Sequence, residues 1–427
     1  MEDLKKKKWP VPVREEERFK GENIKKFLKL RAEYEKSAFV SEGHIEVRRL
    51  GPIAFTRPIP PEESAITALV AYHNGKIYGG TSGKKAHLFY YDPSPDADTV
   101  VDIGVVGENL KITSLVAEEK GRIFGGTVSE KEEGFLFSYS PCEVLMEEIK
   151  LEGKGVREIF DTPVEDQVFH SIVDPSHSAG EINILTTPIK GEGISSLVID
   201  NERKLLYGLS DKSGIFFIYD ISKEKVTIKG KIDEVNEFSQ KLVIDKEGKV
   251  YGAKCRGQII QYDPENDKME ELGLFIPSLK GRELYNRVDS WALDENSGLI
   301  YGGSIDGILF IFNPFERSIT ALGKPIDQAR IRALTVGRDG RVFGIAGEVG
   351  GCAHLFSYNP ENRELKDLGV PLATVETPWY GYEFEAAVTG KDGEIYLGET
   401  DRISHLWIYF PPIPQRQSKM EVGNGRN

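Results

Sequence analysis

A segment that recurs along the chain constrains the fold more than any other feature of this sequence. Its first copy, residues 66–93, consists of three short strand-like runs separated by turns. Similar segments begin at Lys111, Gly193, Ser239, Val288, Ile331 and Phe384. A repeat of this size with several short strands in each copy is typical of a β-propeller rather than of a helical solenoid.

The repeats also predict how the two ends of the chain meet. In several copies the three strands are followed by a fourth, as in residues 268–276, 318–326 and 364–372, but the last copy has no such segment after Pro411. Residues 44–53 resemble the missing strand. Because an open sheet edge is avoided when a ring closes, we expect this N-terminal strand to complete the last blade. The predicted fold is all-β: a seven-bladed β-propeller of four-stranded blades.

The sequence outside the repeats predicts two extensions. Residues 1–40 are rich in charge and carry apolar residues at an approximately helical spacing, which indicates one amphipathic helix. This helix is expected to pack on the outside of the main body, or else to contact a partner subunit. The propeller is assigned to residues 41–413, and residues 414–427 are expected to form a mobile tail.

Charge and cysteine content exclude several classes of protein. The net charge of −13 argues against a surface that binds nucleic acid or an anionic membrane, because both require a basic face. No apolar run is long enough to span a bilayer, and the first residues lack the apolar segment of a secretory signal. Cys142, Cys255 and Cys352 lie in different repeats and match no zinc pattern, so no disulfide framework is expected. We therefore predict a cytoplasmic location.

Long loops on one face of the ring are the first place to look for a site. In an up-and-down blade, the connections between blades lie on one face, where they are long and irregular in this chain. Such loops on a rigid scaffold usually carry function. They contain the candidate ligand-binding or catalytic residues His170, His177, Tyr285, Arg287, Trp379, Tyr380 and Tyr382.

A second set of candidates heads the innermost strand of each repeat. In chain order these residues are Thr67, Thr113, Ser195, Ser239, Asp289, Arg332 and Glu385. Four hydroxyl residues are thus followed by three charged ones in consecutive blades. Because the innermost strands surround the central channel, the three charged residues are expected to approach one another at its mouth. They form either a binding site or an ion-pair cluster that only plugs the channel.

The residue types at this mouth favour an anionic, ring-containing ligand such as a uronic-acid oligosaccharide. Arginine pairs bidentately with carboxylates, and Trp and Tyr faces stack on sugar rings. A lyase acting on such a substrate needs arginine to neutralise the carboxylate and a His or Tyr to take the neighbouring proton. Arg287 and Arg332 would neutralise the carboxylate, and Tyr382 or His170 would be the base. The remaining candidates, which would line the ligand, are Tyr285, Asp289, Glu385, Trp379, Tyr380 and His177.

Two other functions fit the same sequence. The protein could be a non-catalytic scaffold whose loop-bearing face holds a protein partner. It could also be a metal-assisted lactonase or hydrolase, which needs Asp289, Asn286 and Glu385 to converge on the axis, although an arginine between them disfavours a cation. No metal site and no cofactor is assigned.

Three histidines, His87, His354 and His405, open the third strand of neighbouring blades. Strands are spaced about 4.8 Å apart within a sheet, so equivalent atoms this far from the axis should lie on the order of 10 Å apart or more. A zinc ion needs nitrogen ligands at roughly 2.0–2.1 Å. We therefore predict that these histidines tie a loop to the neighbouring blade and do not bind a metal together.

The repeats share two motifs, a D/N-G-x-hydrophobic-Tyr-Gly turn and a Leu-Phe-x-Tyr-Asp-Pro ending. In these motifs residues 43–412 resemble the broad group of bacterial seven-bladed propellers that includes quinoprotein-like, virginiamycin B lyase-like and oligosaccharide lyase domains. The resemblance implies the architecture and, by analogy alone, lyase activity. It carries over no catalytic residue. The chain lacks the Trp-Asp dipeptides of WD40 proteins and the tryptophan-docking repeats of quinoproteins that bind pyrroloquinoline quinone.

Overall fold

The computed structural model describes residues 40–50, 59–94, 97–131, 133–141, 180–234, 238–348, 351–373, 379–401 and 403–412. Within these ranges the regular elements are strands, with two short 3-10 helices, η3 (Pro61–Glu63) and η5 (Cys255–Gly257). The predicted N-terminal amphipathic helix and the whole predicted C-terminal tail lie outside the described residues. None of the described helices is long and apolar enough to cross a membrane.

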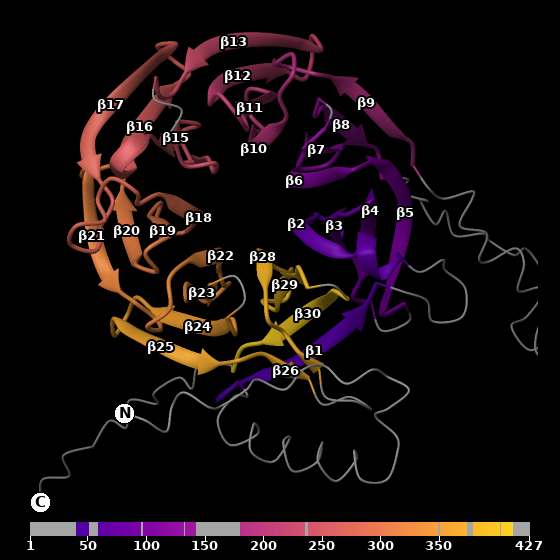
Figure 1. Ribbon diagram of the computed structural model, residues 1–427, viewed down its shortest axis with the longest axis vertical. Coiled ribbons are helices and arrows are strands. Elements are labelled where there is room, and N and C mark those ends of the chain that lie inside the picture. The colour runs from indigo at the N-terminus through magenta and orange to yellow at the C-terminus, as the bar shows by residue number, and fades with distance from the viewer. Residues whose placement is uncertain are drawn as a thin grey trace, which may run out of the picture.

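Four-stranded antiparallel sheets are arranged in a ring, each with its first strand nearest the centre (Figure 1). The first blades contain β2 (Ala65–Ala71), β3 (Ile77–Ser82), β4 (Lys85–Asp92) and β5 (Thr99–Glu108), then β6 (Leu110–Ala117), β7 (Ile123–Ser129), β8 (Leu136–Tyr139) and β9 (Ile182–Thr186). A single bridge between Ser82 and Lys111 joins these two into one eight-stranded sheet.

The next blades follow the repeats in the same way. They contain β10 (Ile194–Asp200), β11 (Leu205–Ser210), β12 (Ile215–Asp220) and β13 (Lys225–Lys231), then β14 (Val243–Ile244), β15 (Val250–Ala253), β16 (Gln258–Asp263) and β17 (Lys268–Phe275). After them come β18 (Val288–Leu293), β19 (Ile300–Ser304), β20 (Leu309–Asn313) and β21 (Ser318–Gly323), then β22 (Ile331–Val336), β23 (Val342–Ala346), β24 (His354–Asn359) and β25 (Glu364–Gly369). A small hairpin of β26 (Leu372–Ala373) and β27 (Trp379–Tyr380) precedes the last blade.

The ring is closed by strands from opposite ends of the chain. β28 (Phe384–Thr389), β29 (Ile395–Glu399) and β30 (His405–Phe410) form the last sheet, and β1 (His44–Arg49) adds to β30 as its outer strand. The two strands pair antiparallel along their whole length (Figure 1). The N-terminal strand thus completes the last blade, as the sequence predicts.

The paired glycines of the repeat explain how neighbouring blades pack. A Cβ on Gly79 would lie 2.1 Å from the Phe89 ring of its own blade, and a Cβ on Gly80 would lie 2.4 Å from Ile112 of the next blade. The same relations recur for Gly125 and Phe137, Gly208 and Phe217, Gly302 and Phe310, and for Gly126 and Ile194, Gly303 and Ile331, Gly398 and Ile66. The first glycine therefore makes room for an aromatic ring, and the second allows the next blade to approach.

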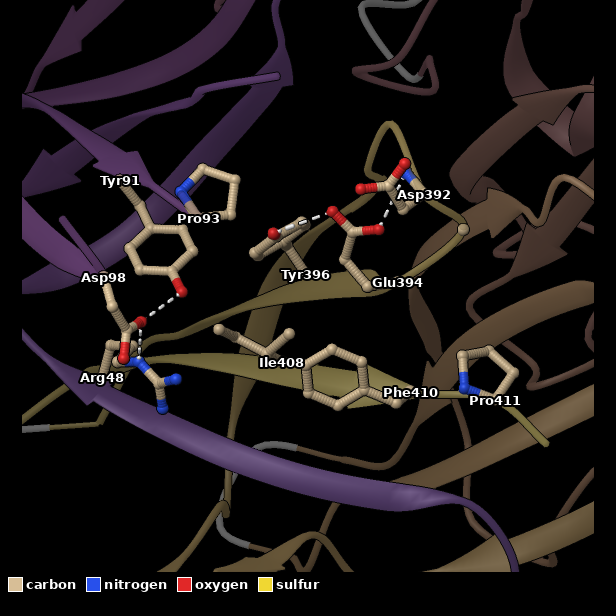
Figure 2. A pocket seen from close by; sticks show the side chains of 11 residues that line it. Arg48, Tyr91, Pro93, Asp98, Asp392, Glu394, Tyr396, Ile408, Phe410 and Pro411 are labelled. Atoms are coloured by element: carbon tan, nitrogen blue, oxygen red, sulfur yellow. Dashed lines mark hydrogen bonds and ion pairs between the residues drawn. The ribbon is translucent and has the colours of Figure 1, made fainter. Parts of the chain in front are cut away.

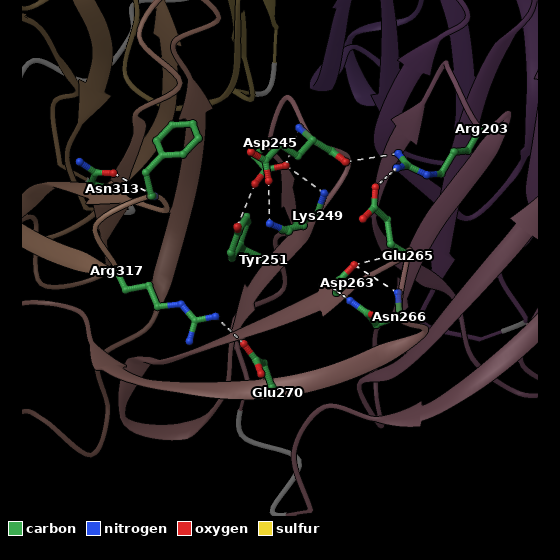
Figure 3. Close-up of polar contacts among 12 residues, drawn as sticks. Arg203, Asp245, Lys249, Tyr251, Asp263, Glu265, Asn266, Glu270, Asn313 and Arg317 are labelled. Atoms are coloured by element: carbon green, nitrogen blue, oxygen red, sulfur yellow. Dashed lines mark hydrogen bonds and ion pairs between the residues drawn. The ribbon is translucent and has the colours of Figure 1, made fainter.

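Polar contacts on the outer turns join the blades further. Arg203 bonds Asp200 of its own turn at 2.9 Å. In Figure 3 it also reaches Glu265 of the next blade, at 3.4 Å. On the far side of that blade, Arg317 pairs with Glu270 at 2.9 Å. These exposed pairs contribute little each, typically about 0–1 kcal/mol. The buried apolar clusters between sheets hold the ring, and they fix the innermost strands around its axis.

Candidate functional site

Six of the innermost strands carry an irregularity at the same place. In β2, β6, β10, β18, β22 and β28 the pairing register skips one residue near the start of the strand. The skipped residues are Thr67, Thr113, Ser195, Asp289, Arg332 and Glu385. A β-bulge leaves its extra residue outside the ladder and re-aims its side chain. The strand-head positions found in the sequence are therefore bulge positions that can point away from the sheet.

These bulges surround a cavity of about 350 Å³ at the axis of the ring. Five of the six bulged residues line it, together with residues from the adjoining loops. The polar residues that line the cavity are Lys111, Thr113, Ser195, Asp211, Ser239, Gln240, Lys241, Arg287, Asp289, Arg330, Arg332 and Glu385. The structure thus brings together the three charged strand-head residues and Arg287, as expected from the sequence.

The acidic residues of the cavity are held by cations. Arg332 donates from Nη2 to Oε1 of Glu385 at 2.6 Å, and Lys111 bonds the other oxygen of the same carboxylate. Burial alone would raise the pKa of Glu385, but Lys111 and Arg332 lower it below its ordinary value. Asp289 is bound in bidentate fashion by Arg330, with Nε and Nη2 each at 2.7 Å. Asp289 therefore pairs with Arg330 and not with Arg332.

Two basic residues of the cavity have donor atoms without a partner among the described residues. The side chain of Arg332 is only 9% exposed, and its second terminal nitrogen, Nη1, is buried and makes no hydrogen bond. Lys241 lines the same cavity, and within the described ranges it makes no ion pair at contact distance, although Glu385 and Asp289 lie near enough to interact with its charge. Five basic residues face three acidic ones here, although the protein as a whole is acidic. The cavity is therefore a local positive site with unsatisfied donor capacity.

Three of these residues were missed in the sequence: Lys111, Lys241 and Arg330. Lys111 and Arg330 stand two positions before the bulged residues Thr113 and Arg332, as Arg287 stands two before Asp289. Residues two apart in extended backbone face the same side, which applies to Lys111 and Thr113 of β6. A basic residue at this spacing in three repeats was therefore a usable signal. Arg330 has φ 69°, a backbone conformation that is uncommon outside glycine. In this conformation its side chain binds Asp289.

The aromatic candidates are not among the residues that line this cavity. Tyr382 packs against Cys352 and Val370. Tyr285 lies in the loop before β18 with 62% of its surface exposed. Trp379 donates from Nε1 to Glu399 at 3.3 Å, and the ring of Tyr380 lies 6.4 Å from that of Tyr382. His170 and His177 lie outside the described residues.

The residue set of the lactonase alternative does not assemble. Glu385 and Asp289 line the cavity but are engaged by lysine and arginine, whereas Asn286 donates to the carbonyl of Pro277 and is not among the lining residues. Among the residues that the structure describes, no group of three or more His, Cys, Asp or Glu side chains could hold a metal ion.

The three repeat histidines each pair with a carboxylate. His354 contacts Asp367 at 2.9 Å, and His405 contacts Glu399 at 2.9 Å, in both cases within one blade. His87 lies between Asp102 of its own blade and Glu63 of η3, at 3.0 and 3.1 Å. The predicted tie to a neighbouring blade is therefore wrong for His354 and His405. These histidines fasten the ends of the third strands.

Glu399 is the centre of a buried polar cluster in the last blade. Its carboxylate accepts hydrogen bonds from Nδ1 and the backbone N–H of His405 and from Nε1 of Trp407 and of Trp379. Burial raises the pKa of Glu399. Two residues on, burial and then the nearby Glu399 and Glu383 raise the pKa of Asp401 to about 7. The blade that closes the ring therefore holds two carboxyl groups that resist ionisation.

Asp401 should make stability depend on pH. Its folded-state pKa of about 7 lies above the ordinary aspartate value of about 3.9, so the native state holds the proton more tightly than the unfolded state. The contribution to stability is present in full below about pH 4 and is lost as pH rises to about 7. We expect Asp401→Asn to be more stable than the parent at pH 8, with a shallower decline between pH 5 and pH 8 in urea titrations. The exposed Asp327→Asn should leave the slope unchanged.

A second cavity, of about 430 Å³, lies where β1 closes the ring (Figure 2). Its charged groups are largely satisfied by each other. Asp98 accepts from Arg48 at 2.7 Å and from the Tyr91 hydroxyl at 2.6 Å, and Tyr396 donates to Glu394 at 2.9 Å. Although this cavity is the larger, it offers no buried unpaired cation, so the axial cavity is the better candidate.

A ring of four-stranded sheets with a polar cavity on its axis defines a β-propeller protein. No family model and no curated protein matches the sequence. Solved structures do match. Virginiamycin B lyase from Staphylococcus aureus is 10% identical, with a TM-score of 0.61, over 87% of this chain and 100% of that chain. The WD40 repeats of RRP9 are 11% identical, with a TM-score of 0.54, over 88% of this chain and 99% of that one.

A third match is the extracellular domain of the putative one component system BT4673 from B. thetaiotaomicron, at 14% identity and a TM-score of 0.53. It covers 86% of this chain, which spans only 40% of the length of that protein. At these identities the likeness shows the fold alone. The prediction of an all-β propeller is confirmed. The matched folds include both a lyase and WD40 repeats, so they do not decide between catalysis and scaffolding.

Proposed function

We propose that the protein binds an acidic sugar in the axial cavity and acts on it as a lyase. The observation that carries this proposal is the Nη1 atom of Arg332, which is buried beside the cavity without a hydrogen-bond partner. An unsatisfied buried donor is costly, and a charged one more so. A ligand carboxylate would satisfy it and would meet the positive surplus of the cavity.

The size of the cavity limits how much of the ligand it holds. Its volume of about 350 Å³ is near the lower end of ligand pockets, which span roughly 300–1,000 Å³. One acidic sugar unit would fit inside, and the rest of an oligosaccharide would extend over the loops. Tyr285 is exposed on the loop that also carries Arg287, where its ring is available to stack on a second unit.

The lyase assignment rests on chemistry that the cavity can support. Removal of the proton next to a carboxylate builds negative charge on that group, and a preorganised cation lowers the barrier. Arg332 is well suited to this role because Glu385 holds its guanidinium in place through Nη2, while Nη1 makes no hydrogen bond. The matched virginiamycin B lyase is in keeping with lyase chemistry on this fold, but by analogy only.

The test is a comparison of acidic and neutral sugars. Galacturonate and glucuronate oligomers should raise the melting temperature of the protein in proportion to ligand concentration over Kd, whereas the matching neutral oligomers should not. Added salt should weaken the effect. Absorbance of the unsaturated uronate should then grow with time. If no acidic oligomer shifts the melting temperature, the proposal is wrong.

A second candidate function is binding of a protein partner by the loop-bearing face. The loop before β18 is held firmly, because Asp306 accepts hydrogen bonds from Arg282 and from the backbone of Leu279. It nevertheless exposes Leu284 by 52% and Tyr285 by 62%. Apolar side chains displayed on a rigid loop are typical of interaction sites. If no acidic sugar raises the melting temperature of the protein, this second function is favoured.

A further inference from the structure

We propose that Lys241 is the base of the lyase reaction, taking the proton from the sugar carbon next to the carboxylate that Arg332 holds. The inference rests on the proposed function and names its catalytic residue. It starts from the geometry of the cavity, which Lys241 and Arg332 both line, while Nη1 of Arg332 makes no hydrogen bond. A carboxylate bound at one group would present its neighbouring carbon to the other.

The other candidate bases are occupied or absent from the cavity. Glu385 is neutralised by Lys111 and Arg332, and its pKa is low. Asp289 is clamped by Arg330. Asp211 accepts the backbone N–H of Gly193. The bases predicted from the sequence do not replace them, since Tyr382 does not line the cavity and His170 lies outside the described residues.

The surroundings of Lys241 favour the neutral amine that a base requires. Burial lowers the pKa of Lys241, and the positive charges of Lys111 and Arg332 lower it further, while Glu385 and Asp289 oppose the change. Burial and nearby cations are the conditions that turn lysine into a base or nucleophile near neutral pH. The remaining charged groups that line the cavity, Asp211, Arg287 and Arg330, complete this environment.

The reaction balances without an oxidant or a metal. The proton on the carbon next to the carboxylate passes to Nζ of Lys241. The electron pair of that C–H bond forms a double bond to the adjacent ring carbon, and the bond from this carbon to the linking oxygen breaks. The departing oxygen takes a proton from water. The products are an unsaturated uronate and a shortened sugar chain, and Lys241 returns its proton to solvent.

The experiment compares three variants on a galacturonate oligomer, by calorimetry for binding and by absorbance for elimination. Lys241→Met should keep the affinity within a few fold, since Arg332 holds the carboxylate, and should lower the elimination rate on the order of 10²–10⁴-fold. Lys241→Arg should bind and fail to react. Lys223→Met, on an exposed turn, should behave like the parent. The parent rate should rise with pH through the lowered pKa of Lys241, and the variants should lose this dependence.

A second measurement uses the unaltered protein, in case the variants do not fold. Limiting trinitrobenzenesulfonate at pH 7 should modify Lys241 before the exposed lysines, and the galacturonate oligomer should protect it, as mapped by mass spectrometry. Binding without elimination in the parent, elimination that survives in Lys241→Met, or modification of Lys241 no faster than of exposed lysines would each overturn the role of Lys241. Absence of binding would instead overturn the proposed function.

Discussion

Arg332→Ala is expected to abolish the response to acidic sugars. Truncating one partner of a buried, hydrogen-bonded charge pair costs roughly 2–5 kcal/mol, and each 1.4 kcal/mol is tenfold in affinity. The affinity for a galacturonate oligomer should therefore fall by at least ~30-fold. Calorimetric titration and the ligand-induced shift in melting temperature measure this loss. Arg332→Lys keeps the positive charge but lacks the two terminal nitrogens with which a guanidinium can bind Glu385 and a ligand carboxylate together. It should therefore recover only part of the affinity.

Two controls separate binding from folding. Arg317→Ala removes an exposed arginine that pairs with Glu270 on the outer surface, and it should bind the oligomer like the parent. Arg332→Ala also leaves Glu385 with Lys111 as its remaining partner, which should lower stability. Adding Glu385→Gln should restore part of the stability but none of the binding. An oligomer that stabilises Arg332→Ala as strongly as the parent would show that the carboxylate lies elsewhere.

The propeller was predictable because the same packing contacts recur between its blades and leave the same residues in each repeat. Gly80, Gly126, Gly303 and Gly398 each meet an isoleucine of the next blade, so the same local pattern recurs at four places around the ring. The closure by β1 followed from the same logic, since the last repeat lacked an outer strand that residues 44–53 resembled. Departures from the repeat then pointed to Asp289, Arg332 and Glu385, which line one cavity.

The rest of the site was not predictable, because the ion pairs depend on the distances between side chains in the folded protein. Asp289 pairs with Arg330. The sequence alone instead groups Asp289 with Arg332, two residues further along the chain. Lys241 lies before a short innermost strand, β14, where the repeat pattern is weakest. The sequence predicts that the ring of Trp379 stacks on a sugar, but its indole nitrogen donates a hydrogen bond to the buried carboxylate of Glu399. A single sequence shows which residues are unusual, and not whether an unusual residue faces a cavity or a core.

Glu399→Ala is expected to be the most destabilising single change in the last blade. Glu399 is fully buried, and its loss would leave the buried donors of His405 and Trp407 without their acceptor. Removing one partner from a buried polar pair typically costs about 3–5 kcal/mol. Denaturation in urea at pH 7 measures the effect. Glu399→Gln retains an acceptor of the same shape and should lose much less.

The position of Glu399 gives this prediction a second, local readout. His405 and Trp407 belong to β30, the strand that pairs with β1 to close the ring. Loss of Glu399 should therefore speed hydrogen exchange of the amides of β1 and β30 more than those of β12, on the opposite part of the ring. The exposed Glu265→Ala should stay within about 0.5 kcal/mol of the parent, as surface changes usually do. If Glu399→Ala also stayed that close, the buried cluster would not hold the closure, and the β1–β30 ladder alone would have to do so.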